Sequence, residues 1–192
     1  MVSEDGGPSR RGLLGATTAA LGSGAALVLT GCGASRTGAN EVHKAKPPVR
    51  HADIALLKAL LDLERKTVAA YTAGLPLLSH PDARTAKQFL NEELQHTGEL
   101  IALIKAAGGK APPHLGAYDL GQPADGAAIL ALLHGLERAQ ISAYLAAIPR
   151  LSPGPVRAAA ATVLASDAQH LVVLRSAQGL DPMPSAFLTG QQ

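Results

Sequence analysis

The 192-residue sequence predicts an all-α fold, a four-helix bundle of two helix pairs joined by a long crossover loop. Apolar residues recur at steps of three and four in four segments, which is the period of a helix with one buried face. No segment sustains an alternation of polar and apolar residues, so we expect no β-sheet. The connection between the second and third segments is the longest, about sixteen residues, and a crossover between the middle helices needs such a connection.

Capping and turn residues set the bounds of the first two helices. The first is expected over about 52–73, ending at Gly74. The second follows Ser79, whose side chain can cap a helix, and continues to about 107. Gly108 then supplies the left-handed conformation that ends many helices.

The third and fourth helices follow the long loop, 110–125, which contains three prolines. Asp125 can cap the third helix, expected over about 126–148. The fourth opens within 152–156 and ends at Gly179.

The N-terminus has the features of an export signal. Paired arginines in SRRGLL (9–14) precede an apolar stretch in which Gly and Thr reduce the hydrophobicity. This pattern resembles a twin-arginine signal. The stretch closes on LTGC (29–32), which resembles a bacterial lipobox. Cys32 is the single cysteine of the chain. Lipid attachment explains both its position after the apolar stretch and the lack of a second cysteine. The alternative is an uncleaved signal anchor over 13–31, which is about long enough to span a bilayer.

Both alternatives place the folded domain outside the cytoplasmic membrane. We expect export by the twin-arginine machinery and a lipid anchor on Cys32 at the outer face of the bacterial cell membrane. The expected parts are a signal peptide with lipobox (1–32), a flexible tether (33–50), a bundle (51–180) and a C-terminal tail (181–192).

Composition excludes one class of partner. Charged residues make up 17% of the chain, the net charge is +2, and Lys and Arg form no stripe, so no nucleic acid is expected. Hydrophobic residues make up 47%, which is enough for one domain with a core.

Two short stretches repeat each other. LERKTVAAY (63–71) and LERAQISAY (136–144) each place a Glu and a Tyr two helical turns apart. Glu64 and Glu137 are separated by 73 residues (137 − 64), and both fall on the apolar face expected to point into the bundle.

A second motif repeats at nearly the same offset. Glu93 with His96, and Asp167 with His170, each place an acid three residues before a histidine, 74 residues apart (167 − 93). Residues three apart share one helix face, so each acid and its histidine can bind the same metal ion. The chain is therefore two copies of a helix pair, and an approximate twofold axis would bring four acids and two histidines together at mid-bundle.

The segment from about 52 to 179 resembles the ferritin-like family of carboxylate-bridged di-metal proteins, in which two helices each supply a Glu and two each supply Glu-x-x-His. The resemblance implies a dinuclear metal site with these ligands: Glu64, Glu93, His96, Glu137, Asp167 and His170. Asp167 stands where the family usually has Glu. Its side chain is one methylene shorter, which argues against a role in bridging the two metal ions. Tyr71 stands where many members have a tyrosine near the metals, which implies a catalytic role. The alternative is that Tyr71 and Tyr144 are core residues whose hydroxyls orient ligand carboxylates. An export signal before the bundle also resembles uncharacterised bacterial ferritin-like lipoproteins.

The resemblance also implies a chemistry. Carboxylate and imidazole ligands suit two iron ions, with manganese as the alternative. The implied reaction is Fe(II) oxidation or the reduction of O2 or peroxide, as in an oxidase or peroxidase. The sequence allows a homodimer.

A metal-free bundle is the competing hypothesis. Four buried carboxylates without partners would be very costly, and two divalent cations would balance their charge. Alternatively, the acids are protonated or paired with Arg65 and Arg138, and the bundle is a binding or structural module of the cell envelope. The intact set of six residues favours the metal site.

The sequence also predicts which residues near the predicted ligands point into the bundle and which point into solvent. Val68 and Leu130 are expected on the inward faces of their helices, and His134 is expected to pack in the core. Glu92 is expected on a solvated face, whereas Glu99, one turn past a predicted ligand, could contact the ligands.

Overall fold

The structure, a computed structural model, describes residues 49–114 and 117–192. The expected export signal, Cys32 and most of the tether lie outside the described residues. In the part that is described, no helix combines the length and the apolar character that crossing a membrane requires.

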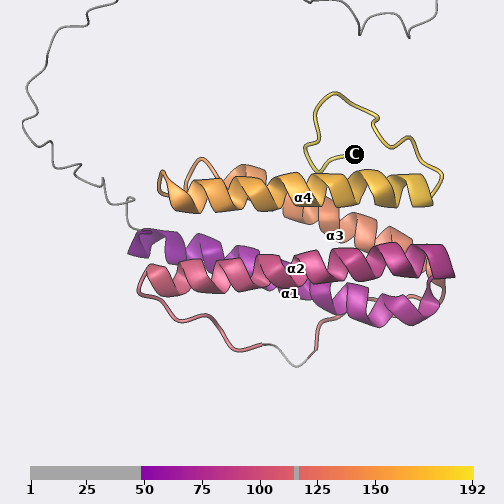
Figure 1. The fold of residues 1–192 in the computed structure, drawn as a ribbon, viewed down its shortest axis with the longest axis horizontal. Helices are drawn as coiled ribbons and strands as arrows, with labels where there is room; N and C mark the ends of the chain where they lie inside the picture. Colours follow the sequence, from indigo (N-terminus) through magenta and orange to yellow (C-terminus); the bar gives the residue numbers. More distant parts are fainter. Residues whose placement is uncertain (1–48, 115–116) are drawn as a thin grey trace, which may run out of the picture. The chain divides into compact units, whose positions relative to one another are not determined.

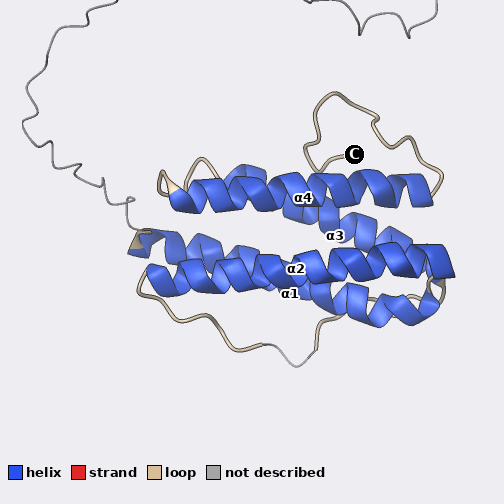
Figure 2. Ribbon diagram, in the orientation of Figure 1, coloured by secondary structure: helices blue, strands red, loops and turns tan. Residues whose placement is uncertain are grey.

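The described residues form four α-helices and no strand, so the all-α prediction is confirmed (Figure 2). The helices are α1 (Ile54–Gly74), α2 (His80–Ala106), α3 (Gly126–Ala147) and α4 (Pro155–Ala177). A turn of 3-10 helix, His51–Asp53, leads into α1, and another, Leu75–Leu77, follows it.

Each half of the bundle is an antiparallel helix pair, α1 with α2 and α3 with α4 (Figure 1). α2 and α3 point in the same direction along the bundle (Figure 1). α1 also packs closely against α3, whereas α2 and α4 face each other more loosely. This is the crossover topology expected from the long second connection.

The predicted caps form. Ser79 and Asp125 each accept a hydrogen bond from a backbone amide in the first turn of α2 and α3. Gly108, after α2, has a φ of 79°. α1 continues through Gly74, which is needed for close packing: a Cβ there would lie 2.8 Å from Cγ2 of Ile129 on α3.

A buried aspartate joins the start of α1 to the loop before α4. Asp53 Oδ1 accepts a hydrogen bond from the Ser152 amide at 2.9 Å, and Oδ2 accepts one from the Arg50 amide at 3.1 Å. Burial alone would raise the pKa of Asp53, but these hydrogen bonds to its ionised form outweigh burial and lower the pKa.

The C-terminal segment folds back onto α3. Arg138 Nε donates to the Gly190 carbonyl at 3.3 Å, and Ser142 Oγ donates to the Thr189 carbonyl at 3.1 Å. Gly190 has a φ of 77°, and a Cβ there would collide with the Ser142 hydroxyl and the Arg138 carbonyl. The last residues of the expected tail therefore pack on the bundle.

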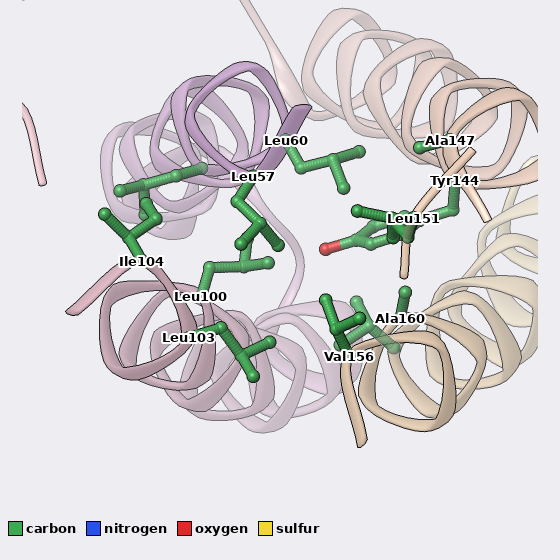
Figure 3. Packing of buried hydrophobic residues seen from close by; sticks show 12 residues of the cluster. Leu57, Leu60, Leu100, Leu103, Ile104, Tyr144, Ala147, Leu151, Val156 and Ala160 are labelled. Carbon is green, nitrogen blue, oxygen red and sulfur yellow. The ribbon is translucent and has the colours of Figure 1, made fainter. Parts of the chain in front are cut away.

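Two hydrophobic clusters fill the bundle on either side of a polar layer. Figure 3 shows one cluster, which includes Leu57, Leu60, Leu100, Leu103, Ile104, Tyr144, Ala147, Leu151, Val156 and Ala160. The other cluster includes Ala70, Tyr71, Ala86, Phe89, Ile129, Leu133, Leu136 and Leu174. Each cluster contributes one tyrosine next to the polar layer, which contains the predicted ligands.

Candidate metal centre

All six residues predicted as ligands meet in the polar layer at mid-bundle. They are Glu64 on α1, Glu93 and His96 on α2, Glu137 on α3, and Asp167 and His170 on α4. Five have side chains that are at most 1% exposed, and His96 is 12% exposed. Every helix therefore contributes to one buried cluster, as the two repeats predict.

The cluster consists of two overlapping groups. One is Glu64, Glu93, His96 and Asp167, and the other is Glu93, Glu137, Asp167 and His170. Within each group, one ligand atom from every residue lies within 4.8 Å of the others. Glu93 and Asp167 belong to both groups, so the shorter side chain of Asp167 still reaches both positions.

Both histidines turn Nδ1 toward the carboxylates. His96 Nδ1 lies 3.5 Å from Asp167 Oδ1, and His170 Nδ1 lies 3.1 Å from Glu93 Oε1. The other ring nitrogen of His170, Nε2, lies 2.7 Å from Glu92 Oε2. A carboxylate on the outer nitrogen orients an imidazole for metal binding.

Six buried polar atoms in this cluster have no hydrogen-bond partner among the described residues. They are Glu93 Oε1, His96 Nδ1, Glu137 Oε2, Asp167 Oδ1, Asp167 Oδ2 and His170 Nδ1. Leaving a buried polar atom unpaired costs about 1–3 kcal/mol. All six atoms belong to predicted ligands, and metal ions would pair with them, so the residues present fit a metal centre.

The ferritin-like domain family matches residues 52–180. The chain belongs to this family. The crystal structure of a conserved hypothetical protein, rv2844, from Mycobacterium tuberculosis is similar to the chain with a TM-score of 0.64 and 23% sequence identity, over 71% of this chain and 96% of that one. At this identity the similarity shows the fold alone. A comparison with curated proteins gives no match.

Two tyrosines of the ferritin-like domain donate hydrogen bonds to carboxylates of predicted ligands. Tyr71 Oη donates to Glu137 Oε1 and Tyr144 Oη donates to Glu64 Oε1, each at 2.6 Å. Each tyrosine thus donates its hydrogen bond to the glutamate of the other helix pair, as the approximate twofold relation requires. The two hydroxyls have equivalent places, and the catalytic role of Tyr71 remains a prediction.

A buried amide closes the side of the cluster between α1 and α3. Gln140 Nε2 donates to Glu64 Oε2 at 2.9 Å and to Glu93 Oε2 at 3.0 Å. Its Oε1 accepts a hydrogen bond from Thr67 Oγ1 at 2.8 Å. Gln140 therefore links carboxylates of α1 and α2 and fixes their orientation.

Without bound metal, protons offset part of the buried charge. Burial raises the pKa of Glu64 to about 8 and raises the pKa of Asp167 well above its ordinary value. Burial alone would lower the pKa of the histidines, but neighbouring carboxylates raise it to about 9 for His96 and about 10 for His170. Metal binding needs ionised carboxylates and neutral imidazoles, so it would release protons.

The arginines proposed as partners for the acids are used elsewhere. Arg65 Nη1 donates to the Pro112 and Pro113 carbonyls at 2.9 and 3.2 Å, and Arg138 binds the C-terminal segment. Within the described residues, neither arginine forms an ion pair with the cluster. His134 is partly buried, with Nε2 3.5 Å from Arg175 Nη1, and lies outside both ligand groups.

One expectation about the inward faces is wrong. Val68 is only partly buried, and its neighbour Thr67 is buried instead, where its hydroxyl donates to Gln140. Leu130 is partly buried and packs against the second hydrophobic cluster, next to the fully buried Ile129. A stripe of apolar residues does not determine which of two adjacent residues on a helix is the more buried.

Glu92 and Gln140 were missed as contributors to the centre. Glu92 was expected on a solvated face but contacts His170, and no local pattern on α2 could indicate a partner on α4. Gln140 had a signal: it stands three residues after Glu137, the same spacing as in the acid-x-x-His motifs. Glu99 is exposed and lines a groove beside His96.

Proposed function

We propose that this ferritin-like domain binds a dinuclear iron centre, with manganese as the alternative metal, and uses it to oxidise Fe(II) or to reduce O2 or peroxide. The proposal depends on the set of buried atoms that have no hydrogen-bond partner among the described residues, on four of the six predicted ligands and on His96. Carboxylates and imidazoles in this proportion suit iron and manganese better than copper or structural zinc.

Charge and geometry support two ions rather than one. The cluster offers two overlapping ligand groups, and four carboxylates would balance two divalent cations. Glu93 and Asp167 reach both positions and would bridge them. A single ion would leave part of the cluster unpaired in a buried layer, which is costly.

When bound, two iron ions would supply two electrons, which with two protons convert O2 to H2O2, or H2O2 to two water molecules. The residues of the chain would bind the ions and hold protons beside them. Tyr71 is the catalytic residue of this proposal on the family resemblance of its position; its hydroxyl carries a proton next to the cluster, as that of Tyr144 also does. Tyr144 and Gln140 would orient the carboxylates.

The proposal includes a location. The paired arginines and the LTGC stretch support export through the twin-arginine machinery and a lipid on Cys32. The domain would then stand at the outer face of the bacterial cell membrane. Because this route carries folded proteins, the centre could receive its metal before export.

The test is an anaerobic Fe(II) titration of the purified protein, followed by exposure to O2 or H2O2. We expect two Fe(II) ions to bind per chain and to be oxidised, with a new near-ultraviolet absorption. Glu64→Ala combined with Glu137→Ala should abolish this, whereas Asp62→Ala, at an exposed position of α1, should not.

A different result would favour the competing hypothesis. No bound iron or manganese and no spectral change would indicate a metal-free ferritin-like bundle that acts as a binding or structural module of the cell envelope. Equal loss in the double variant and in Asp62→Ala would count against the ligand assignment.

A further inference from the structure

The two histidines of the centre occupy equivalent places but have different neighbours. His170 is 1% exposed, its Nε2 lies 2.7 Å from Glu92 Oε2, and its ring stacks on Phe89 with centroids 4.1 Å apart. His96 is 12% exposed. His170 is therefore fixed in orientation and covered by its neighbours, whereas His96 is partly exposed to solvent.

The repeat explains this asymmetry. The offset of 74 residues between α2 and α4 matches Phe89 with Val163 (89 + 74) and Glu92 with Ser166 (92 + 74). Val163 and Ser166 are smaller than their counterparts, and both line hollows beside His96. Two large residues thus cover one histidine, and two small residues leave space beside the other.

The space forms a groove between α2 and α4. Two hollows, of about 360 and 270 Å³, share Gln95, His96 and Thr162 and so form one groove. We name it the His96 groove, and its polar lining is Glu92, Gln95, His96, Glu99, Thr162 and Ser166. Six water molecules occupy roughly 180 Å³ at about 30 Å³ each, so a hydrated divalent cation fits.

The lining suits a cation. It offers two carboxylates, an amide, hydroxyls and an imidazole, and among the described residues that line it none is Lys or Arg. Carboxylates along a groove raise the local concentration of cations. At its base, His96 Nδ1 lies 3.6 Å from Glu93 Oε1 and 3.5 Å from Asp167 Oδ1. These carboxylate atoms are fully buried and have no hydrogen-bond partner within the described part of the chain.

We propose that divalent cations reach the centre through the His96 groove, and that the ion beside His96 exchanges with solvent while the ion beside His170 is retained. The inference rests on the proposed metal centre. It follows from the two different surroundings: the position beside His170 is closed by Glu92 and Phe89, whereas the position beside His96 lies under the groove.

Uptake is tested by filling the groove. Stopped-flow absorption would follow anaerobic binding of Co(II) to the full-length chain. Thr162→Trp should slow binding severalfold without changing the final number of bound ions. The matched control is Ala161→Trp, an exposed position on the same helix outside the groove, which should bind at the wild-type rate. Glu99→Gln should also slow binding at low salt, and high salt should remove that difference.

Exchange is tested by chelation. After loading with Co(II), EDTA should remove one ion from the wild-type chain at least about tenfold faster than the other. His96→Ala should retain only the slowly released ion. Glu92→Gln should accelerate release of that ion, because His170 loses the carboxylate that orients it.

The outcomes separate the two proposals. No bound Co(II) in any of these proteins would overturn the metal centre and with it the inference. Two bound ions with the same uptake rate in Thr162→Trp and Ala161→Trp would leave the centre standing and overturn the route. Release of both ions at one rate would overturn the assignment of the exchangeable position.

Discussion

Replacing Asp167 by asparagine should have opposite effects on stability with and without metal. The Asp167 side chain is fully buried, and neither of its oxygens has a hydrogen-bond partner among the described residues. Burial raises the pKa of Asp167, and the charges of the neighbouring Glu64, Glu137 and Glu93 raise it further. Asparagine has nearly the same size, carries no charge, and can donate to these carboxylates.

The magnitude follows from the unpaired atoms. Relieving an unsatisfied buried polar group contributes about 1–3 kcal/mol, so Asp167→Asn should stabilise the metal-free protein by about that amount. In a domain of roughly 140 residues, an unfolding entropy of about 2.1 cal/mol/K per residue converts each kcal/mol into about 3 °C. The melting temperature in EDTA should therefore rise by about 3–9 °C.

Bound metal should reverse the order of the two melting temperatures. Asp167 belongs to both ligand groups, so the wild-type protein should bind both ions more tightly than Asp167→Asn. A ligand at 100 times its dissociation constant stabilises the folded state by about 2.7 kcal/mol per site. With excess Mn(II), the wild-type protein should melt at the higher temperature.

Thermal unfolding followed by circular dichroism, in EDTA and in Mn(II), measures both effects. Asp62→Asn makes the same chemical change at an exposed position and should shift the melting temperature little in either condition. A lower melting temperature for Asp167→Asn than for the wild-type protein in EDTA would contradict this prediction, because the carboxylate would then stabilise the metal-free bundle.

Three further predictions concern the hydrogen bonds around the centre and at the start of α1. Tyr71→Phe and Tyr144→Phe should each destabilise the protein by about 1–3 kcal/mol in urea unfolding, since each removes a hydrogen bond to a buried carboxylate; clearly unequal losses would contradict their equivalence. Gln140→Leu should cost about 2–4 kcal/mol because it removes two such bonds, whereas the exposed Gln169→Leu should cost little. The lowered pKa of Asp53 means that its contribution is fully present above its ordinary pKa of 3.8 and is lost as pH falls through the lower value in the folded state. The stability advantage of the wild-type protein over Asp53→Asn should therefore be constant near neutral pH and shrink in acid, and an advantage that grows in acid would contradict this.

The helices and the meeting of the six candidate residues at mid-bundle could be predicted because they depend on local spacing and on the repeat. Ser79 and Asp125 cap helices through their own sequence neighbours. An acid and a histidine three residues apart share a helix face whatever the rest of the fold does. The offset between the two repeats then predicts that Glu64 and Glu137 take equivalent places in the two helix pairs.

The supporting contacts could not be predicted in the same way. Whether Glu92 faces solvent or His170 depends on the rotation of α2 about its axis and on the distance to α4. The choice between Thr67 and Val68 as the inward residue of α1 depends on a similar rotation. These quantities are set by packing between helices, and an apolar stripe determines them only approximately.

Native mass spectrometry of the purified protein, after anaerobic incubation with Fe(II) or Mn(II), would count the metal ions bound at the cluster. We expect two ions per chain in the wild-type protein and fewer in Glu93→Ala, because Glu93 belongs to both ligand groups. A wild-type chain with no bound ion, or two ions still bound in Glu93→Ala, would contradict a dinuclear centre at this site.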